Sequence, residues 1–141
     1  MADNKTIVMR WYKDVWEKGD PGPLDELLAD DYLDHNPMPG LGADKAGAGE
    51  VVKAIMSDAT DVKMDVQDII AEGDFVAAHW KMDWTQQGNF MGMVLADGKR
   101  LSIEGHDFVR LQNGKVAEVW HVEDMMSVMG QLGMIPPPPG S

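Results

Sequence analysis

Two stretches near the C-terminus decide the fold, Lys99-Arg-Leu-Ser-Ile-Glu-Gly-His-Asp-Phe-Val-Arg-Leu111 and Lys115-Val-Ala-Glu-Val-Trp-His-Val-Glu-Asp124. Apolar and polar residues largely alternate in both, as side chains do on the two faces of a β-strand. The connecting Gln112-Asn-Gly-Lys115 is a strong hairpin signal, because both Asn and Gly accept a positive φ. We therefore predict a long antiparallel hairpin here.

The pattern upstream of this hairpin changes from helical to alternating. Apolar residues at three- and four-residue spacing predict three helices, and alternation predicts two further strands. Asp3 or Asn4 can cap the first helix, and Gly19-Asp-Pro-Gly-Pro23 ends it. Helices followed by antiparallel strands indicate an α+β domain with its helices on one face of a curved sheet. The expected elements are a helix from about residue 4, helices over 23–29 and 44–59, strands over 62–70 and 75–86, and a short C-terminal helix over 125–132.

Composition limits the classes of protein that this chain can represent. Its 141 residues have 24 acidic and 12 basic side chains and no cysteine, which excludes disulfides, thiolate metal sites and a cysteine nucleophile. The net charge of −12 argues against a nucleic-acid partner, and no apolar run is long enough to predict a membrane span. We expect one cytoplasmic domain over residues 1–135 and a disordered, proline-rich tail over 136–141.

Histidines are the main candidates for proton transfer near neutral pH, and the chain has four, at positions 35, 79, 106 and 121. No two histidines and a carboxylate stand at helical spacing, so we predict no metal site. His79 alternates with apolar neighbours and is expected in solvent.

The register of the predicted hairpin determines where His121 lies. In a regular ladder His106 faces His121, and both lie outside the core. A one-residue bulge near Ala117 or Glu118 instead places Asp107 beside His121 and turns His106 outward. The count of apolar residues on each face slightly favours the regular register.

The order of several segments resembles the SnoaL-like polyketide (ester) cyclases of the nuclear-transport-factor-2-like superfamily. The resemblance covers nearly the whole chain and implies a cone-shaped, bent sheet around three N-terminal helices, with a deep apolar pocket. It also implies a homodimer or homotetramer formed through the outer sheet surface, and chemistry without a metal or cofactor. The segments are Met9-Arg-Trp-Tyr-Lys-Asp-Val-Trp-Glu-Lys-Gly-Asp20, Leu27-Leu-Ala-Asp-Asp-Tyr-Leu-Asp-His-Asn-Pro37, Gly88-Asn-Phe-Met-Gly92, Asn113-Gly-Lys-Val-Ala-Glu-Val-Trp-His-Val-Glu-Asp124 and Gln131-Leu-Gly-Met-Ile-Pro136.

The resemblance also implies site residues. His121 stands where these folds usually place a catalytic aspartate, and Asp107 stands where the cyclases tend to place its histidine partner, so the pair is kept with its members exchanged. His35 lies in the segment that closes the pocket in many members. The resemblance supports the bulged register. The residues expected to line the pocket are Trp11, Val15, Trp80, Met82, Val109 and Val119.

We expect an enzyme that performs cofactor-free acid–base chemistry, an aldol-type cyclisation or a related proton transfer, on a hydrophobic carbonyl compound such as a polyketide. His121 would act as base or acid with Asp107 orienting it, and His35 or a tryptophan N–H would donate to an enolate oxygen. The alternatives are a ketosteroid-isomerase-like isomerase and a non-catalytic small-molecule-binding or dimerisation module. Epoxide opening as in limonene-type hydrolases is disfavoured, because Trp80 and Met82 stand at two of that site's polar positions.

Overall fold

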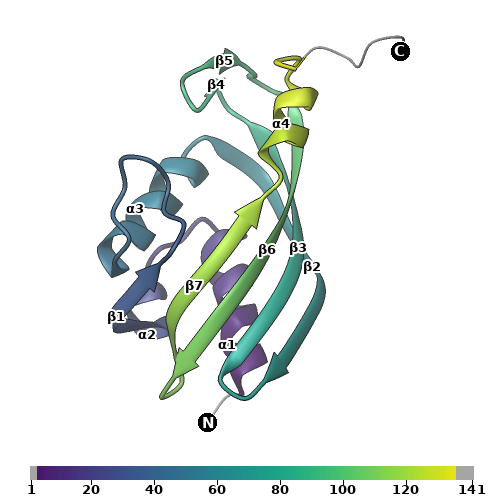
Figure 1. The fold of residues 1–141 in the computed structure, drawn as a ribbon. Coiled ribbons are helices and arrows are strands. Elements are labelled where there is room, and N and C mark those ends of the chain that lie inside the picture. The colour runs from purple at the N-terminus through teal and green to yellow at the C-terminus, as the bar shows by residue number, and fades with distance from the viewer. Residues whose placement is uncertain (1–2, 136–141) are drawn as a thin grey trace.

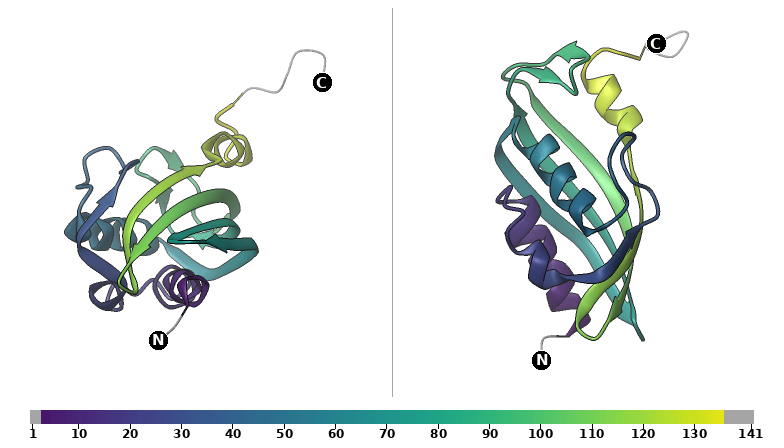
Figure 2. Two further views of the ribbon diagram at one scale, coloured as in Figure 1. Left: turned by 60° about the horizontal axis from the view of Figure 1, so that its bottom comes forward. Right: turned by 90° about the vertical axis from the view of Figure 1, so that its left-hand side faces the viewer.

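The protein is described by a computed structural model covering residues 3–135. It has a five-stranded sheet in the order β1-β7-β6-β3-β2, in which β1 runs parallel to β7 and the other pairs are antiparallel. The sheet curls around the N-terminal helices, and α4 and the small β4–β5 hairpin lie at one end (Figures 1 and 2). The elements are α1 (Asn4–Arg10), η1 (Trp11–Trp16), α2 (Leu24–Leu27), β1 (Leu28–Asp34), α3 (Lys45–Met56), β2 (Ala59–Glu72), β3 (Phe75–Gln86), β4 (Asn89–Phe90), β5 (Val94–Leu95), β6 (Arg100–Gln112), β7 (Lys115–Glu123) and α4 (Met125–Gln131).

The α+β architecture predicted from the sequence is confirmed. Asp3 caps α1 by accepting a hydrogen bond from the backbone N–H of Thr6, and Asp44 caps α3 in the same way through Gly47. The first helix continues beyond Arg10 as the π-helical η1. The predicted tail over 136–141 lies outside the described residues.

The second helix is shorter than predicted. It ends at Leu27, and Leu28 begins strand β1, which pairs with Val116 of β7. Leu28 is fully buried there. Parallel pairing with a distant strand thus overrides the local helical spacing over residues 23–29.

The β6–β7 hairpin has the bulged register. Asp107 pairs with His121 and Val109 with Val119, whereas beyond the register shift Leu111 pairs with Val116. Ala117 is the extra residue, and it is buried together with Val116. The regular register favoured by the apolar count is therefore wrong.

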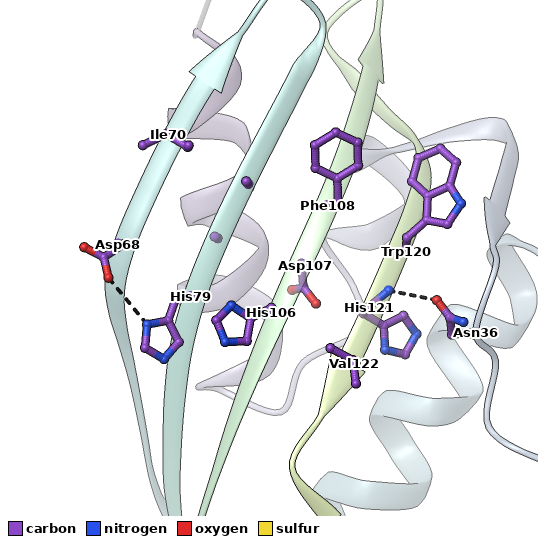
Figure 3. Close-up of a pocket in the computed structure, with 12 residues that line it drawn as sticks. Asn36, Asp68, Ile70, His79, His106, Asp107, Phe108, Trp120, His121 and Val122 are labelled. Atoms are coloured by element: carbon purple, nitrogen blue, oxygen red, sulfur yellow. Dashed lines mark hydrogen bonds and ion pairs between the residues drawn. The ribbon is translucent and has the colours of Figure 1, made fainter.

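The apolar count misled because the outer sheet face is itself apolar. Phe108, Trp120 and Val122 line a hollow of about 540 Å³ on that face, and its lining also includes Asp107 and His121 (Figure 3). Val122 is 64% exposed, so its hydrophobicity says nothing about which face packs on the core.

No helix in the described part of the chain is both long and apolar enough to cross a membrane.

Candidate functional site

His121 is held between two carboxylates on the helix side of the sheet. Its Nε2 lies 2.9 Å from Oδ1 of Asp34, the last residue of β1, and its Nδ1 bonds Oε1 of Glu123 in β7. The backbone N–H of His121 donates to Oδ1 of Asn36 at 2.9 Å, which fastens the segment after β1 to β7. The imidazole ring is thus fixed on both edges.

These two carboxylates keep His121 protonated. Burial by itself lowers the pKa of the imidazole, but the hydrogen bonds with Asp34 and Glu123 outweigh burial and raise that pKa to about 10. A protonated imidazole has no free lone pair and cannot accept a proton. At neutral pH His121 therefore supplies a fixed positive charge, and the expectation that it acts as a general base has no support in this geometry.

Asp107, in β6, has a carboxyl group held by two donors on the same oxygen. The hydroxyl of Tyr12, from η1, donates to Oδ2 at 2.6 Å, and the indole N–H of Trp80, from β3, donates to Oδ2 at 3.0 Å. No side chain among residues 3–135 donates to Oδ1. Because no buried side-chain oxygen in that range lacks a partner, Oδ1 keeps contact with solvent. Oδ1 is thus the carboxyl oxygen that receives no side-chain hydrogen bond.

Burial raises the pKa of Asp107 to about 6, although the Tyr12 hydrogen bond, the charge of His121 and the Trp80 hydrogen bond all act to lower it. The pKa of Tyr12 is raised by its own burial and by the negative charge of Asp107, so its hydroxyl stays protonated and remains a donor. Asp107 is consequently an ionised carboxylate at neutral pH that still has appreciable basicity, as a general base requires.

Asp107, His121 and Glu123 lie close together, with one potential ligand atom from each within 4.8 Å of the others. The structure has no direct hydrogen bond or ion pair between Asp107 and His121, so Asp34 and Glu123, rather than Asp107, orient the imidazole. Such a trio is the one group of ligands found among residues 3–135 that could hold a metal ion. Both ring nitrogens of His121 already bond carboxylates, which makes it a poor metal ligand.

The residues predicted to line a pocket belong to the buried core around this site. Trp80 contacts Asp107 directly, and Trp11 stacks on Tyr12 with ring centroids 6.4 Å apart. Every predicted lining residue is less than 9% exposed, namely Trp11, Val15, Trp80, Met82, Val109 and Val119.

His35 is not brought to this site. Its ring stacks on Trp120 at a centroid distance of 4.3 Å, and its Nε2 lies 3.6 Å from Glu118. Trp120 faces the hollow on the outer sheet face (Figure 3). On that same face His79 and His106 stack on each other, 4.5 Å apart, so the outward orientation of His106 expected from the bulged register is confirmed.

Three site residues were missed by sequence reasoning: Tyr12, Asp34 and Glu123. Asp34 directly precedes His35, but its contact with His121 spans 87 positions and depends on the parallel β1–β7 pairing. The polar tip of Tyr12 is the available signal, because the hydroxyl of a buried tyrosine needs a hydrogen-bond partner.

The protein is thus a small α+β domain with titratable side chains on the helix side of a curved sheet. A family model described as SnoaL-like polyketide cyclase matches residues 6–132. The chain therefore belongs to the SnoaL-like polyketide cyclase family.

Solved structures agree with this assignment. TsrD from Streptomyces laurentii is 25% identical to the chain, with a TM-score of 0.82 over 96% of this chain and 100% of that one. Wild-type IdmH from Streptomyces antibioticus, described as a candidate polyketide cyclase, is 27% identical, with a TM-score of 0.81 over 94% and 99%. AclR from Streptomyces galilaeus, described as a candidate hydroxylase, is 26% identical, with a TM-score of 0.81 over 96% and 88%. No curated protein sequence matches the chain.

Proposed function

We propose that this protein is an enzyme that moves a proton on a hydrophobic carbonyl compound, such as a polyketide, without a metal or cofactor, and so promotes an aldol-type cyclisation or a related isomerisation. Asp107 is the general base and His121 supplies a fixed positive charge. The observation that carries the proposal is the partly buried Asp107 carboxyl group, whose Oδ2 accepts two hydrogen bonds while Oδ1 accepts none from a side chain.

The reaction begins when Oδ1 of Asp107 takes the proton from a carbon flanked by carbonyl groups. Such a carbon is already fairly acidic, and positioned proton transfer contributes about 10²–10⁴-fold in rate. The electron pair moves onto the carbonyl oxygen and forms an enolate. The enolate carbon then attacks an internal carbonyl in a cyclisation, or it is reprotonated at another position in an isomerisation.

His121 stabilises the enolate through its charge. Both of its N–H groups already donate, to Asp34 and Glu123, so neither is free to donate to the substrate. Ligand atoms of His121 and Glu123 both lie within 4.8 Å of the Asp107 carboxylate, so the imidazolium compensates the flanking carboxylates that would otherwise repel a developing enolate. In this assignment Asp107 is the base, whereas the sequence led us to expect that role for His121.

The buried aromatic side chains give the site its preference for apolar substrates. Trp80 itself donates to Asp107, and Trp11 stacks on Tyr12, which donates to the same carboxyl oxygen. We assign the wall of the substrate site to these two residues and to the other predicted lining residues, Val15, Met82, Val109 and Val119.

Exchange of a carbon-bound proton tests the proposal directly. An α-methylated aryl β-keto ester is incubated with the protein in deuterated buffer, and the loss of its α-proton signal is followed by NMR. We expect exchange above the protein-free rate, a fall to that background in Asp107→Asn, and no change in His106→Ala, whose exposed ring lies on the outer face. Exchange that is not accelerated, or that is unchanged in Asp107→Asn, refutes the proposal.

We also propose that the protein is a homodimer formed through the outer sheet face. Exposed apolar side chains gather there, among them Ile70, Phe108 and Val122, and patches of this kind mark interaction sites. Sedimentation equilibrium should give a dimer for the wild type and a monomer for Phe108→Asp. The matched control, Leu95→Asp in β5, replaces another exposed apolar residue and should stay dimeric. A monomeric wild type contradicts the proposal.

A further inference from the structure

Gly105 lies directly opposite Trp80 in the β3–β6 ladder, on the face that packs against the core. A Cβ atom built on Gly105 would overlap three carbon atoms of the Trp80 indole, Cζ2, Cε2 and Cη2, each at less than 3.0 Å. The indole therefore occupies the space that any side chain at position 105 would fill.

The backbone does not require glycine at this position. Eight other glycines of the described chain have a positive φ, but Gly105 is not among them. Its conformation is one that any residue adopts, so the close approach of the indole is the structural reason for a glycine here.

The part of the indole that lies over Gly105 is directly joined to the atom that reaches the site. Cε2 is bonded to Nε1, and the Nε1–H group donates to Oδ2 of Asp107 at 3.0 Å. Asp107 is two residues along β6 from Gly105, hence on the same face of the sheet. An indole lying across position 105 is thereby aimed at position 107.

We propose that Gly105 is a positioning residue for Asp107: its missing side chain lets the Trp80 indole lie across β6 and donate to Oδ2, which leaves Oδ1 as the oxygen that takes the proton. The inference rests on the proposed function, in which Asp107 is the base. It adds that the direction of proton transfer is set by a residue that touches neither the carboxyl group nor the substrate.

The protonation of Asp107 distinguishes this role from simple packing. A hydrogen bond from Trp80 favours the ionised carboxylate and lowers its pKa. If the alanine side chain in Gly105→Ala displaces the indole, that bond is lost and the pKa of Asp107 rises. A glycine needed only for packing would change stability and leave the titration of Asp107 where it is.

Carboxyl NMR of protein labelled with ¹³C at the aspartate Cγ measures this titration, and the resonance is assigned by its loss in Asp107→Asn. We expect the midpoint of Asp107 to move up by about one pH unit in Gly105→Ala and in Trp80→Leu, as for loss of a charge-assisted hydrogen bond. The double variant should titrate like Trp80→Leu alone, because Gly105 acts through the indole. Gly49→Ala in α3, where a Cβ meets nothing within 4 Å, is the matched control and should titrate like the wild type.

A wild-type midpoint in Gly105→Ala overturns the inference, as does a midpoint in the double variant well above that of Trp80→Leu. If Gly105→Ala does not fold, the double variant decides, since leucine removes the ring atoms with which the alanine collides. It should then fold and titrate like Trp80→Leu, and failure to fold overturns the inference too. The titration needs no substrate, so its outcome is separate from that of the exchange assay, where an active Asp107→Asn would refute the proposed function alone.

Discussion

Replacing Asp107 by asparagine should make the protein more stable at neutral pH while abolishing proton transfer. The folded state raises the pKa of this carboxyl group from 3.8 to about 6, first of all through burial. Between these two pH values the folded protein binds more protons than the unfolded chain, so this group makes the wild type less stable as pH rises. The stabilisation that the neutral carboxyl provides is fully present below about pH 3.8 and is lost as the pH rises through about 6.

The size of the effect follows from the shift. A displacement of one pKa unit corresponds to about 1.36 kcal/mol, so ionised Asp107 costs the fold about 3 kcal/mol at high pH. From about pH 4.5 to about pH 7.5 the cost grows by about 2 kcal/mol. Asparagine has no charge to bury, and its side-chain oxygen can accept from Tyr12 and Trp80 while its amide group occupies the place of Oδ1. The variant thus keeps the contacts and removes the cost.

Urea unfolding of both proteins at a series of pH values between these limits measures the difference. We expect the free energy of unfolding of Asp107→Asn minus that of the wild type to increase with pH by about 2 kcal/mol and to level off above about pH 7. Asp31→Asn in β1, an exposed residue, is the matched control and should show no such trend. A difference that is constant with pH, or that falls as pH rises, refutes the conclusion that burial of Asp107 dominates its titration.

Three further predictions concern the charges around Asp107. The rate of α-proton exchange should rise with pH through about 6, as Asp107 ionises, and fall as pH passes about 10, where His121 loses its proton; a pH–rate profile without either limb contradicts the assignment. In Tyr12→Phe the donor at 2.6 Å is lost, so the pKa of Asp107 rises and the acidic limb of the same profile should move up by about one pH unit. In Asp34→Asn the pKa of His121 should fall, since a partner that raises it is neutralised. The stabilisation due to His121 is fully present below about pH 6.5 and is lost as pH rises through about 10, so urea unfolding should show Asp34→Asn destabilised at pH 6 and much less so above pH 10.

Local sequence signals predicted the parts of the fold that depend on neighbouring residues. The Asn113–Gly114 turn has the positive φ angles expected of it, 53° and 76°, and β3 has the predicted bounds 75–86. Local signals do not decide whether β7 has a bulge at Ala117. One extra residue moves the following side chains to the other face, and the outer face of this sheet is apolar as well, so counting apolar residues on each face does not separate the two registers. A decision between the registers needed the resemblance to a known family.

The candidate site was only half accessible to the same reasoning. The proximity of Asp107 and His121 depends only on the register of the β6–β7 hairpin, so it could be predicted from the sequence. The protonation of His121 depends on Asp34, which lies more than eighty positions earlier in the chain and comes close only because β1 pairs with β7. No local sequence pattern predicts that pairing. The sequence could therefore predict that Asp107 and His121 lie together but not the proton held by His121, and this is why our proposal gives the role of base to Asp107 instead.

In our proposal, the exchange of Asp and His that the family resemblance implies moves the proton acceptor from position 121 in β7 to position 107 in β6. A carboxylate at position 121 would face Asp34 and Glu123, and three like charges in one partly buried cluster would repel one another. With histidine there, the two carboxylates enclose a cation instead. The carboxyl group at position 107 is then left with only Tyr12 and Trp80 as donors, so burial dominates and its pKa rises toward neutrality. In our proposal the exchange thus keeps a base in the site and brings the pKa of that base close to neutral pH.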